Sequence, residues 1–94
     1  MMTHSIKQMV LNLSEDELRE MLKREYLRRL TKYKLTDQSF QEKYGMNFEE
    51  FEQENMVAKK GFSFEVESDA QEWELAIDGI KTCQEKLGEL QVGY

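Results

Sequence analysis

The stretch that decides the fold is residues 35–51, LTDQSFQEKYGMNFEEF. Thr36 can cap a helix with its hydroxyl, and Gly45 can end that helix because glycine accepts positive φ. Asn47 can cap the next helix, and Glu50, three residues later, completes a capping box. Two cap signals in close succession predict a short helical hairpin.

Upstream of this stretch, the sequence predicts one amphipathic helix. Ser14 and Glu17 form another capping box, and the helix is expected to run from about Glu15 to about Tyr33. Its apolar side chains recur at helical spacing and form one stripe, made of Leu18, Leu22, Tyr26, Leu30 and Tyr33. Residues 5–13 fit a short strand, a frayed arm or a helix equally well.

Downstream, residues 62–67 alternate apolar and polar side chains, which predicts a short extended link. Ser68, with Gln71, then caps a long amphipathic C-terminal helix. Two interleaved series of apolar residues recur along it every seven residues. One is Trp73, Ile80 and Leu87, and the other is Ala76, Cys83 and Leu90. This stripe packs either on the residue 18–33 stripe of the same chain or on a second chain. We expect a dimer or larger homo-oligomer through residues 73–90.

These signals predict a mainly α protein that forms a single domain over residues 1–94. The order is an N-terminal helix, a short helical hairpin, a short extended link and a long C-terminal amphipathic helix. Residues 1–13 are expected to be a flexible arm or a short N-terminal strand.

The composition narrows the function. The chain has one cysteine and one histidine, so within one chain it forms neither a disulfide nor a His-based triad or metal cluster. No apolar run exceeds three residues, Met9–Leu11 being one of these, and a transmembrane helix needs about 20. We therefore expect a cytoplasmic protein that is not an enzyme, holds no metal and uses no cofactor.

Charge is unevenly distributed along the chain. Residues 1–34 carry eight Lys or Arg and five Asp or Glu, a net charge of +3. Residues 35–94 carry five Lys or Arg and fourteen Asp or Glu, a net charge of −9. An acidic surface attracts basic protein surfaces and accelerates their encounter, although acidic surfaces also serve solubility alone.

One face of the first predicted helix is basic within residues 23–34. The candidate nucleic-acid-binding residues on it are Arg24, Arg28, Arg29 and Lys32. Cations at this spacing can follow a phosphate backbone. Two glutamates, however, precede two of these arginines by four residues, as in ordinary intrahelical ion pairs. Direct DNA binding is therefore a second hypothesis.

The chain also resembles a family of short bacterial and archaeal proteins. The resemblance rests on Tyr26–Leu30 (YLRRL), Phe40–Phe51 (FQEKYGMNFEEF), Phe64–Glu67 (FEVE) and Glu72–Glu74 (EWE), and it covers about residues 22–90. The family is similar to antitoxins of type II toxin–antitoxin pairs, whose partner toxin is a small ribonuclease-like protein. The resemblance implies that this chain binds and neutralises a cognate toxin.

A toxin site that binds RNA is basic, so masking it calls for acidic groups and apolar anchors. The candidate partner-binding residues are Phe62, Phe64, Glu65, Glu67, Asp69, Trp73, Ile77 and Ile80. Inhibition in this picture is steric and electrostatic, with no catalytic residue. The alternatives are a DNA-binding transcriptional repressor that uses the basic face, and a helical homo-oligomeric adaptor or assembly protein.

Overall fold

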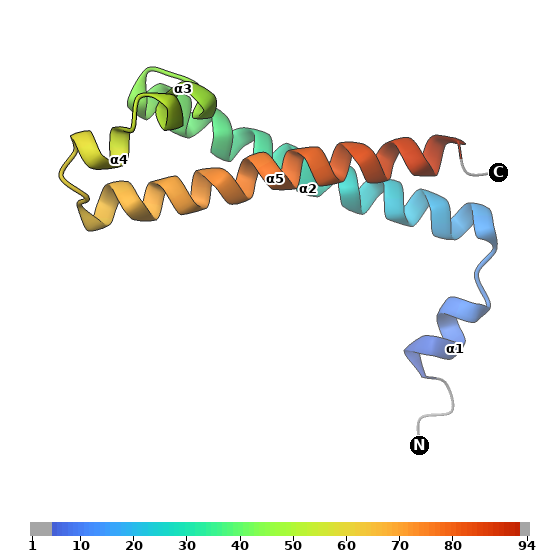
Figure 1. Ribbon diagram of the computed structural model, residues 1–94. Coiled ribbons are helices and arrows are strands. Elements are labelled where there is room, and N and C mark those ends of the chain that lie inside the picture. The colour runs from blue at the N-terminus through green and yellow to red at the C-terminus, as the bar shows by residue number, and fades with distance from the viewer. Residues whose placement is uncertain (1–4, 93–94) are drawn as a thin grey trace.

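The computed structural model describes residues 5–92, and its elements are all helices (Figure 1). They are α1 (Ile6–Leu11), α2 (Glu15–Tyr44), α3 (Phe48–Gln53), α4 (Met56–Lys59) and α5 (Phe64–Val92). No strand occurs within residues 5–92. The mainly α fold class is thereby confirmed, and the suggested N-terminal strand is wrong, because Ser5 caps α1 by accepting the Gln8 N–H.

The long helices α2 and α5 lie antiparallel (Figure 1). We call the end at which α3 and α4 connect them the closed end, and the end with the start of α2 and the C-terminal part of α5 the open end. At the open end, α1 projects away from the pair. The result is an elongated molecule of 57 × 37 × 16 Å with a radius of gyration of 18.9 Å.

The predicted caps at both ends of α2 are present. The Ser14 hydroxyl accepts the Glu17 N–H at 3.1 Å, and the Glu17 carboxylate accepts the Ser14 N–H at 3.0 Å. These two bonds to Ser14 lower the pKa of Glu17. At the other end Gly45 adopts a φ of 68°, and its N–H bonds to the Gln41 carbonyl at 2.8 Å. Glycine adopts the left-handed conformation that ends a helix without strain, because it has no side chain.

The predicted helix boundary near Tyr33 is wrong, since α2 continues without a break to Tyr44. Thr36 does not cap a new helix. Its hydroxyl instead donates to the Lys32 carbonyl at 3.2 Å, as threonine can do inside a helix. Neither proline nor glycine occurs between Tyr33 and Tyr44 to interrupt the backbone ladder. Only the second half of the predicted hairpin, α3 with its Asn47–Glu50 capping box, is confirmed.

The predicted extended link over residues 62–67 is also wrong, because α5 begins at Phe64. The Ser63 hydroxyl accepts the Val66 N–H at 3.3 Å and so caps the helix in place of Ser68, which lies inside it. Glu65 and Glu67 also favour an early start, because carboxylates in a first turn interact well with the helix dipole. Residues 5–92 contain no strand with which an extended link could pair.

The core is concentrated around Trp73 of α5, which has 0% of its surface exposed. Aromatic rings from α2 and α3 surround its indole, with ring centroids 5.1 to 5.9 Å away; they belong to Phe40, Tyr44, Phe48 and Phe51. The indole N–H donates to an Asp37 carboxylate oxygen at 2.8 Å, so this buried donor is satisfied.

Farther along α5, small residues allow close packing on α2. Ala76 and Cys83 are buried. At Gly79, a Cβ atom would lie 2.5 Å from ring carbons of Tyr33. The C-terminal stripe therefore packs on α2 of the same chain, which is the first of the two arrangements considered from the sequence.

We predict that Gly79→Ala destabilises the fold, because the added methyl would overlap the Tyr33 ring and overpacking of this kind costs about 1–3 kcal/mol. Gly88→Ala is the matched control: it lies in the same helix with open space around the added Cβ. That change should stabilise the fold by up to about 1 kcal/mol through helix propensity. Urea unfolding of both variants measures the difference, and equal effects at the two glycines would contradict the close packing.

Candidate functional site

The turn between α4 and α5 places an aromatic side chain on the surface in a strained backbone conformation. The Gly61 N–H bonds to the Ala58 carbonyl and the Phe62 N–H to the Val57 carbonyl, both at 2.9 Å. This pair of bonds is the Schellman motif that ends α4. Phe62 follows Gly61 with a φ of 52°, which is unusual for a bulky residue, and its side chain is 63% exposed.

The first turn of α5 adds a second exposed aromatic side chain. Val66 turns into the core, while Phe64 is 86% exposed and Glu65 and Glu67 are also exposed. We call the four exposed residues Phe62, Phe64, Glu65 and Glu67 the tip surface. The alternating pattern of residues 62–67 predicted that their apolar side chains share one face. In the helix they do not, because Phe64 and Val66 point in different directions.

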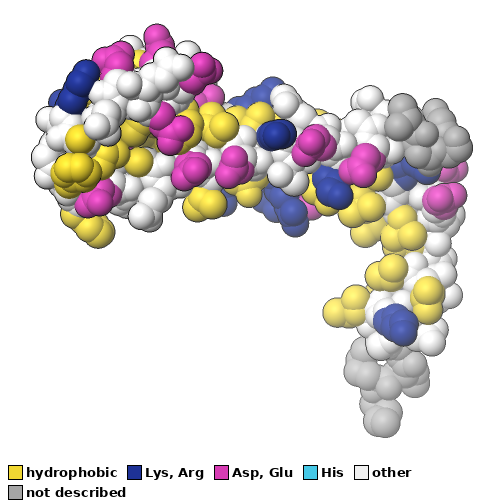
Figure 2. Space-filling view, viewed as in Figure 1, with side chains coloured by type: hydrophobic (Ala, Val, Ile, Leu, Met, Phe, Trp, Pro, Cys, Tyr) yellow, Lys and Arg dark blue, Asp and Glu magenta, His cyan; other side chains and the backbone are white. Residues whose placement is uncertain are grey.

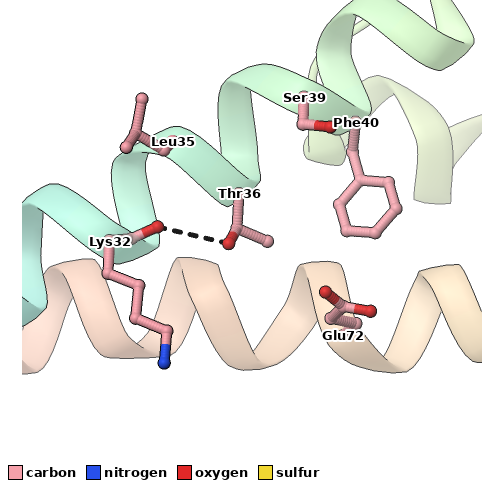
Figure 3. A pocket seen from close by; sticks show the side chains of 6 residues that line it. All are labelled: Lys32, Leu35, Thr36, Ser39, Phe40 and Glu72. Carbon is pink, nitrogen blue, oxygen red and sulfur yellow. Dashed lines mark hydrogen bonds between the residues drawn. The ribbon is translucent and has the colours of Figure 1, made fainter.

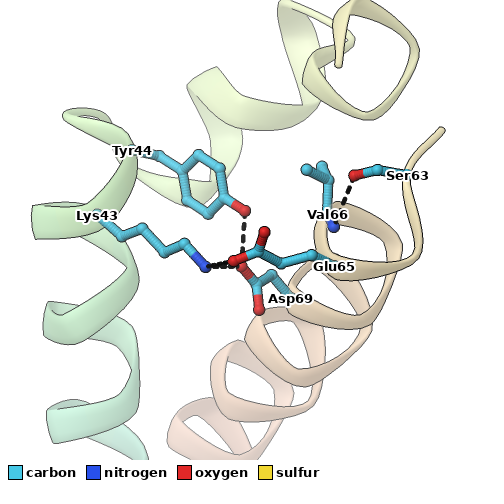
Figure 4. Close-up of polar contacts among 6 residues, drawn as sticks. All are labelled: Lys43, Tyr44, Ser63, Glu65, Val66 and Asp69. Atoms are coloured by element: carbon cyan, nitrogen blue, oxygen red, sulfur yellow. Dashed lines mark hydrogen bonds and ion pairs between the residues drawn. The ribbon is translucent and has the colours of Figure 1, made fainter. Parts of the chain in front are cut away.

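Two carboxylates of α5 are joined to α2 by a polar cluster (Figure 4). The Lys43 ammonium donates to Glu65 at 2.9 Å and to Asp69 at 2.6 Å, and the Tyr44 hydroxyl donates to Asp69 at 2.6 Å. These contacts fix the first two turns of α5 against the end of α2. Lys43 was not predicted from the sequence as a site residue. The signal for it was the spacing of Glu65 and Asp69, two carboxylates four residues apart on one helix face.

The cluster shifts the pKa values of its members. Burial raises the pKa of Asp69, but the hydrogen bonds from Lys43 and Tyr44 outweigh it and hold that pKa below its usual value. The hydrogen bonds that Lys43 donates to Asp69 and Glu65 raise its own pKa. Burial, together with the bond to Asp69, raises the pKa of Tyr44 to about 12. Near neutral pH the lysine and the aspartate are therefore both charged.

The predicted partner-binding residues separate into two groups. Phe62, Phe64, Glu65 and Glu67 lie on the surface at the closed end of the molecule. Trp73 is fully buried, and Asp69, Ile77 and Ile80 are partly buried. Ile77 packs against the cluster around Trp73, and Asp69 holds the polar contacts of Figure 4. Asp69, Trp73 and Ile77 therefore belong to the contacts that hold α5 in place and not to the exposed surface.

Acidic side chains gather over the same end, on α3 and around it (Figure 2). Four exposed carboxylates on α3 and directly after it were not among the predicted site residues; they are Glu49, Glu50, Glu52 and Glu54. Residues 46–69 carry seven Asp or Glu and two Lys, a net charge of −5. The closed end thus combines exposed aromatic rings with strong negative charge.

The predicted nucleic-acid-binding face is partly neutralised by its own helix. Glu25 accepts hydrogen bonds from Arg28 at 2.8 Å and from Arg29 at 2.6 Å. These two guanidinium groups lower the pKa of Glu25 to about 2, so it stays charged. Arg24 lines an open groove together with Asp16, Glu17, Glu20 and Met21. Two of the four predicted cations are therefore paired, and a third lies among carboxylates.

The fourth cation, Lys32, lines a shallow groove between α2 and α5 (Figure 3). The groove also contains Leu35, Ser39 and, from α5, Glu72. Lys32 and Glu72 are the two charged residues in its lining. Cys83 is buried, and no group of three His, Cys, Asp or Glu within residues 5–92 could hold a metal ion. His4 lies outside the described residues.

We predict that the Asp69 cluster contributes to acid sensitivity. A carboxyl group whose pKa is lowered by folding stabilises the fold above its unfolded pKa of about 4. That contribution is lost as the pH falls through the lower, folded value. Asp69→Asn should therefore reduce stability at pH 7 and flatten the fall in urea midpoint below about pH 4. Asp78→Asn makes the same change at an exposed position of α5 and should keep the wild-type profile. An unchanged profile for Asp69→Asn would refute this role.

No helix within residues 5–92 is both long and apolar enough to cross a membrane. No family model, curated protein or solved structure matches this chain.

Proposed function

We propose that this chain is a non-catalytic protein-binding module whose tip surface docks on a basic surface of its partner. In the specific form suggested by the family resemblance, the partner is the small ribonuclease-like toxin of a type II pair. The chain then acts as the antitoxin and masks the toxin's RNA-binding site. Inhibition needs no chemistry from the antitoxin, only occupation of the site.

The exposure and strain of Phe62 carry this proposal. A phenylalanine with a φ of 52° is strained by about 1–2 kcal/mol, and burial does not compensate for this because the ring is 63% exposed. Phe64 adds an aromatic ring that is 86% exposed. Neither ring contributes much to the stability of the free chain, whereas both are suited to fill apolar pockets of a partner.

Charge determines which partner surface fits the tip. The net charge of −5 over residues 46–69 surrounds the aromatic rings with carboxylates. A basic surface, such as one that binds RNA, complements this pattern and is attracted to it over a distance. Acidic nucleic acid is repelled, so the same end does not bind DNA or RNA directly.

The rigid core beneath the tip favours binding. Val66 lies one turn from Ser63 and packs into the cluster around Trp73, and Lys43 joins Glu65 to α2. The aromatic side chains are therefore presented on a backbone that is already ordered. Preorganisation of this kind reduces the entropy that binding must spend on ordering loops.

We predict that Phe64→Ala weakens binding to the cognate toxin by about 30-fold, as expected for a hot-spot anchor of about 2 kcal/mol. Glu67→Lys should weaken it as well and reduce its salt dependence, because it reverses a charge on the tip surface. The matched controls are Leu35→Ala, an exposed apolar residue of α2, and Glu85→Lys, the same charge change far from the tip on α5.

The measurement has two parts. The neighbouring small gene is expressed under tight control, and growth is measured with and without this chain and its variants. Binding of the purified proteins is then measured by calorimetry. A neighbour that does not stop growth, or wild-type protein that does not restore it, would overturn the antitoxin role. Binding that the controls reduce as much as Phe64→Ala would overturn the tip as the binding surface.

We further predict that Phe62→Asn separates stability from binding. Asparagine accepts positive φ more readily than phenylalanine, so the free energy of unfolding should stay unchanged or rise by about 1 kcal/mol. Toxin binding should fall because an aromatic anchor is lost. Urea unfolding and calorimetry measure the two effects on the same protein. A loss of stability without a loss of binding would show that Phe62 has a structural role instead.

A further inference from the structure

The other end of the molecule carries a second exposed apolar surface, on α1. All described residues from Ser5 to Asn12 are exposed, and α1 has no buried residue. Its large apolar side chains are 43–79% exposed; they are Ile6, Met9, Val10 and Leu11. Figure 2 shows hydrophobic side chains on several sides of the projecting arm. A six-residue helix is well below the length of about 12–15 residues at which isolated helices become marginally stable. Packing of its apolar side chains against another surface would stabilise a helix of this length.

The molecule exposes enough surface to supply such an interface. Its accessible surface is 7337 Å², whereas a compact chain of this size exposes about 5,700 Å². The radius of gyration of 18.9 Å likewise exceeds the value of about 12 Å for a compact domain. A standard interface buries about 800 Å² from each partner, which this excess surface accommodates.

The most exposed large apolar side chains lie mainly at the two ends. Ile6, Met9 and Leu11 belong to α1. Phe62, Phe64 and Leu75, which are 63–86% exposed, belong to the closed half of the molecule. Phe64 and Leu75 are eleven residues apart, about three helical turns, so they share one face of α5. Both groups are apolar and could bury each other, but the length of α2 separates them within one chain.

Charge pairs the same two ends. Residues 1–34 carry +3, and residues 79–92, which return beside the start of α2, carry two Lys and two Glu. The open end is therefore basic overall. Residues 35–78 carry three Lys and twelve Asp or Glu, a net charge of −9. A parallel arrangement of two copies would oppose like charges, whereas an antiparallel one places each basic end beside an acidic end.

The chain's own α1 cannot reach its own tip. The 30 residues of α2 span about 45 Å, and residues 5–14 would cover only about 35 Å even if fully extended. A second copy placed antiparallel meets this requirement. Twofold symmetry then makes both contacts identical, as in most homodimers.

We propose that α1 is an exchanged arm: two copies of this chain associate antiparallel, and α1 of each copy packs on Phe62, Phe64 and Leu75 of the other. This rests in part on the proposed function, because the arm covers the tip surface that the toxin is proposed to bind. Binding of the toxin then displaces the arm, and self-association competes with partner binding.

The test measures the mass of the full chain by sedimentation velocity from about 1 to 200 μM, a range that spans the micromolar association expected of a small interface. The wild-type chain should form dimers that weaken with added salt. The double variant Ile6→Asp, Met9→Asp and the single variant Phe64→Asp should each raise the dimer dissociation constant at least about tenfold. Leu35→Asp is the matched control and should remain dimeric, because Leu35 is 61% exposed but lies on neither surface.

Mixing the two variants gives the sharper result. The Phe64→Asp chain retains an intact α1 and the double variant retains an intact tip, so the mixture should form heterodimers through one of the two contacts. The double variant should also bind the toxin at least as tightly as wild type, because no arm competes for its tip. Circular dichroism checks that each variant stays helical.

Several outcomes would overturn the exchanged arm. They are a wild-type chain that is monomeric throughout the range, a Leu35→Asp chain that dissociates like the α1 variant, and a mixture that does not associate. A monomeric wild type that still binds the toxin would refute the dimer and leave the proposed function standing. Dimers that persist when the toxin does not bind would do the reverse.

Discussion

The burial of Trp73 is the constraint on which the rest of the structure depends. Its indole is fully enclosed, and the enclosing rings come from α2 and α3. Gly45, with a φ of 68°, ends α2 and lets α3 return across the helix pair, so that Phe48 and Phe51 cover the indole. The indole N–H would cost about 1–3 kcal/mol if left without an acceptor, so Asp37 completes the arrangement.

Concentrating the core at the closed end has a consequence for the open end. Beyond Gly79 the contact between α2 and α5 depends on the small Cys83 and on half-buried leucines, which bury far less surface than the aromatic cluster does. The chain remains elongated there, and α1 finds no place in a core. Among the large apolar residues that the fold leaves exposed, the α1 residues and the two phenylalanines at the turn leading into α5 each lie close together in the sequence. Association with another chain could bury both groups.

Local signals in the sequence predicted helix ends better than they predicted contacts. The capping boxes at Ser14 and Asn47 formed as predicted, whereas Ser68 and Gln71, at the same spacing, lie inside α5, so this spacing alone does not fix a helix start. Thr36 misled because its hydroxyl can bond either to a free N–H or to the carbonyl four residues earlier. The heptads marked Trp73 as apolar without indicating what covers it, and its bond to Asp37 spans 36 residues. Of the candidate site, Phe62 and Phe64 were predicted from the sequence as partner-binding residues, whereas their exposure follows from the start of α5 at Phe64, which the sequence did not predict.

The same core that buries Trp73 makes the strain at Phe62 tolerable. Its backbone conformation is imposed from both sides, by the Schellman bonds that close α4 and by the Ser63 cap that opens α5. Val66 then attaches this turn to the aromatic cluster, and Lys43 attaches it to α2 through Glu65. Strained residues persist where the surrounding structure over-determines them, and they concentrate at functional sites. The proposed binding surface lies at the end of the molecule that contains the aromatic core, so its geometry does not depend on the open end, where α1 has no buried residue.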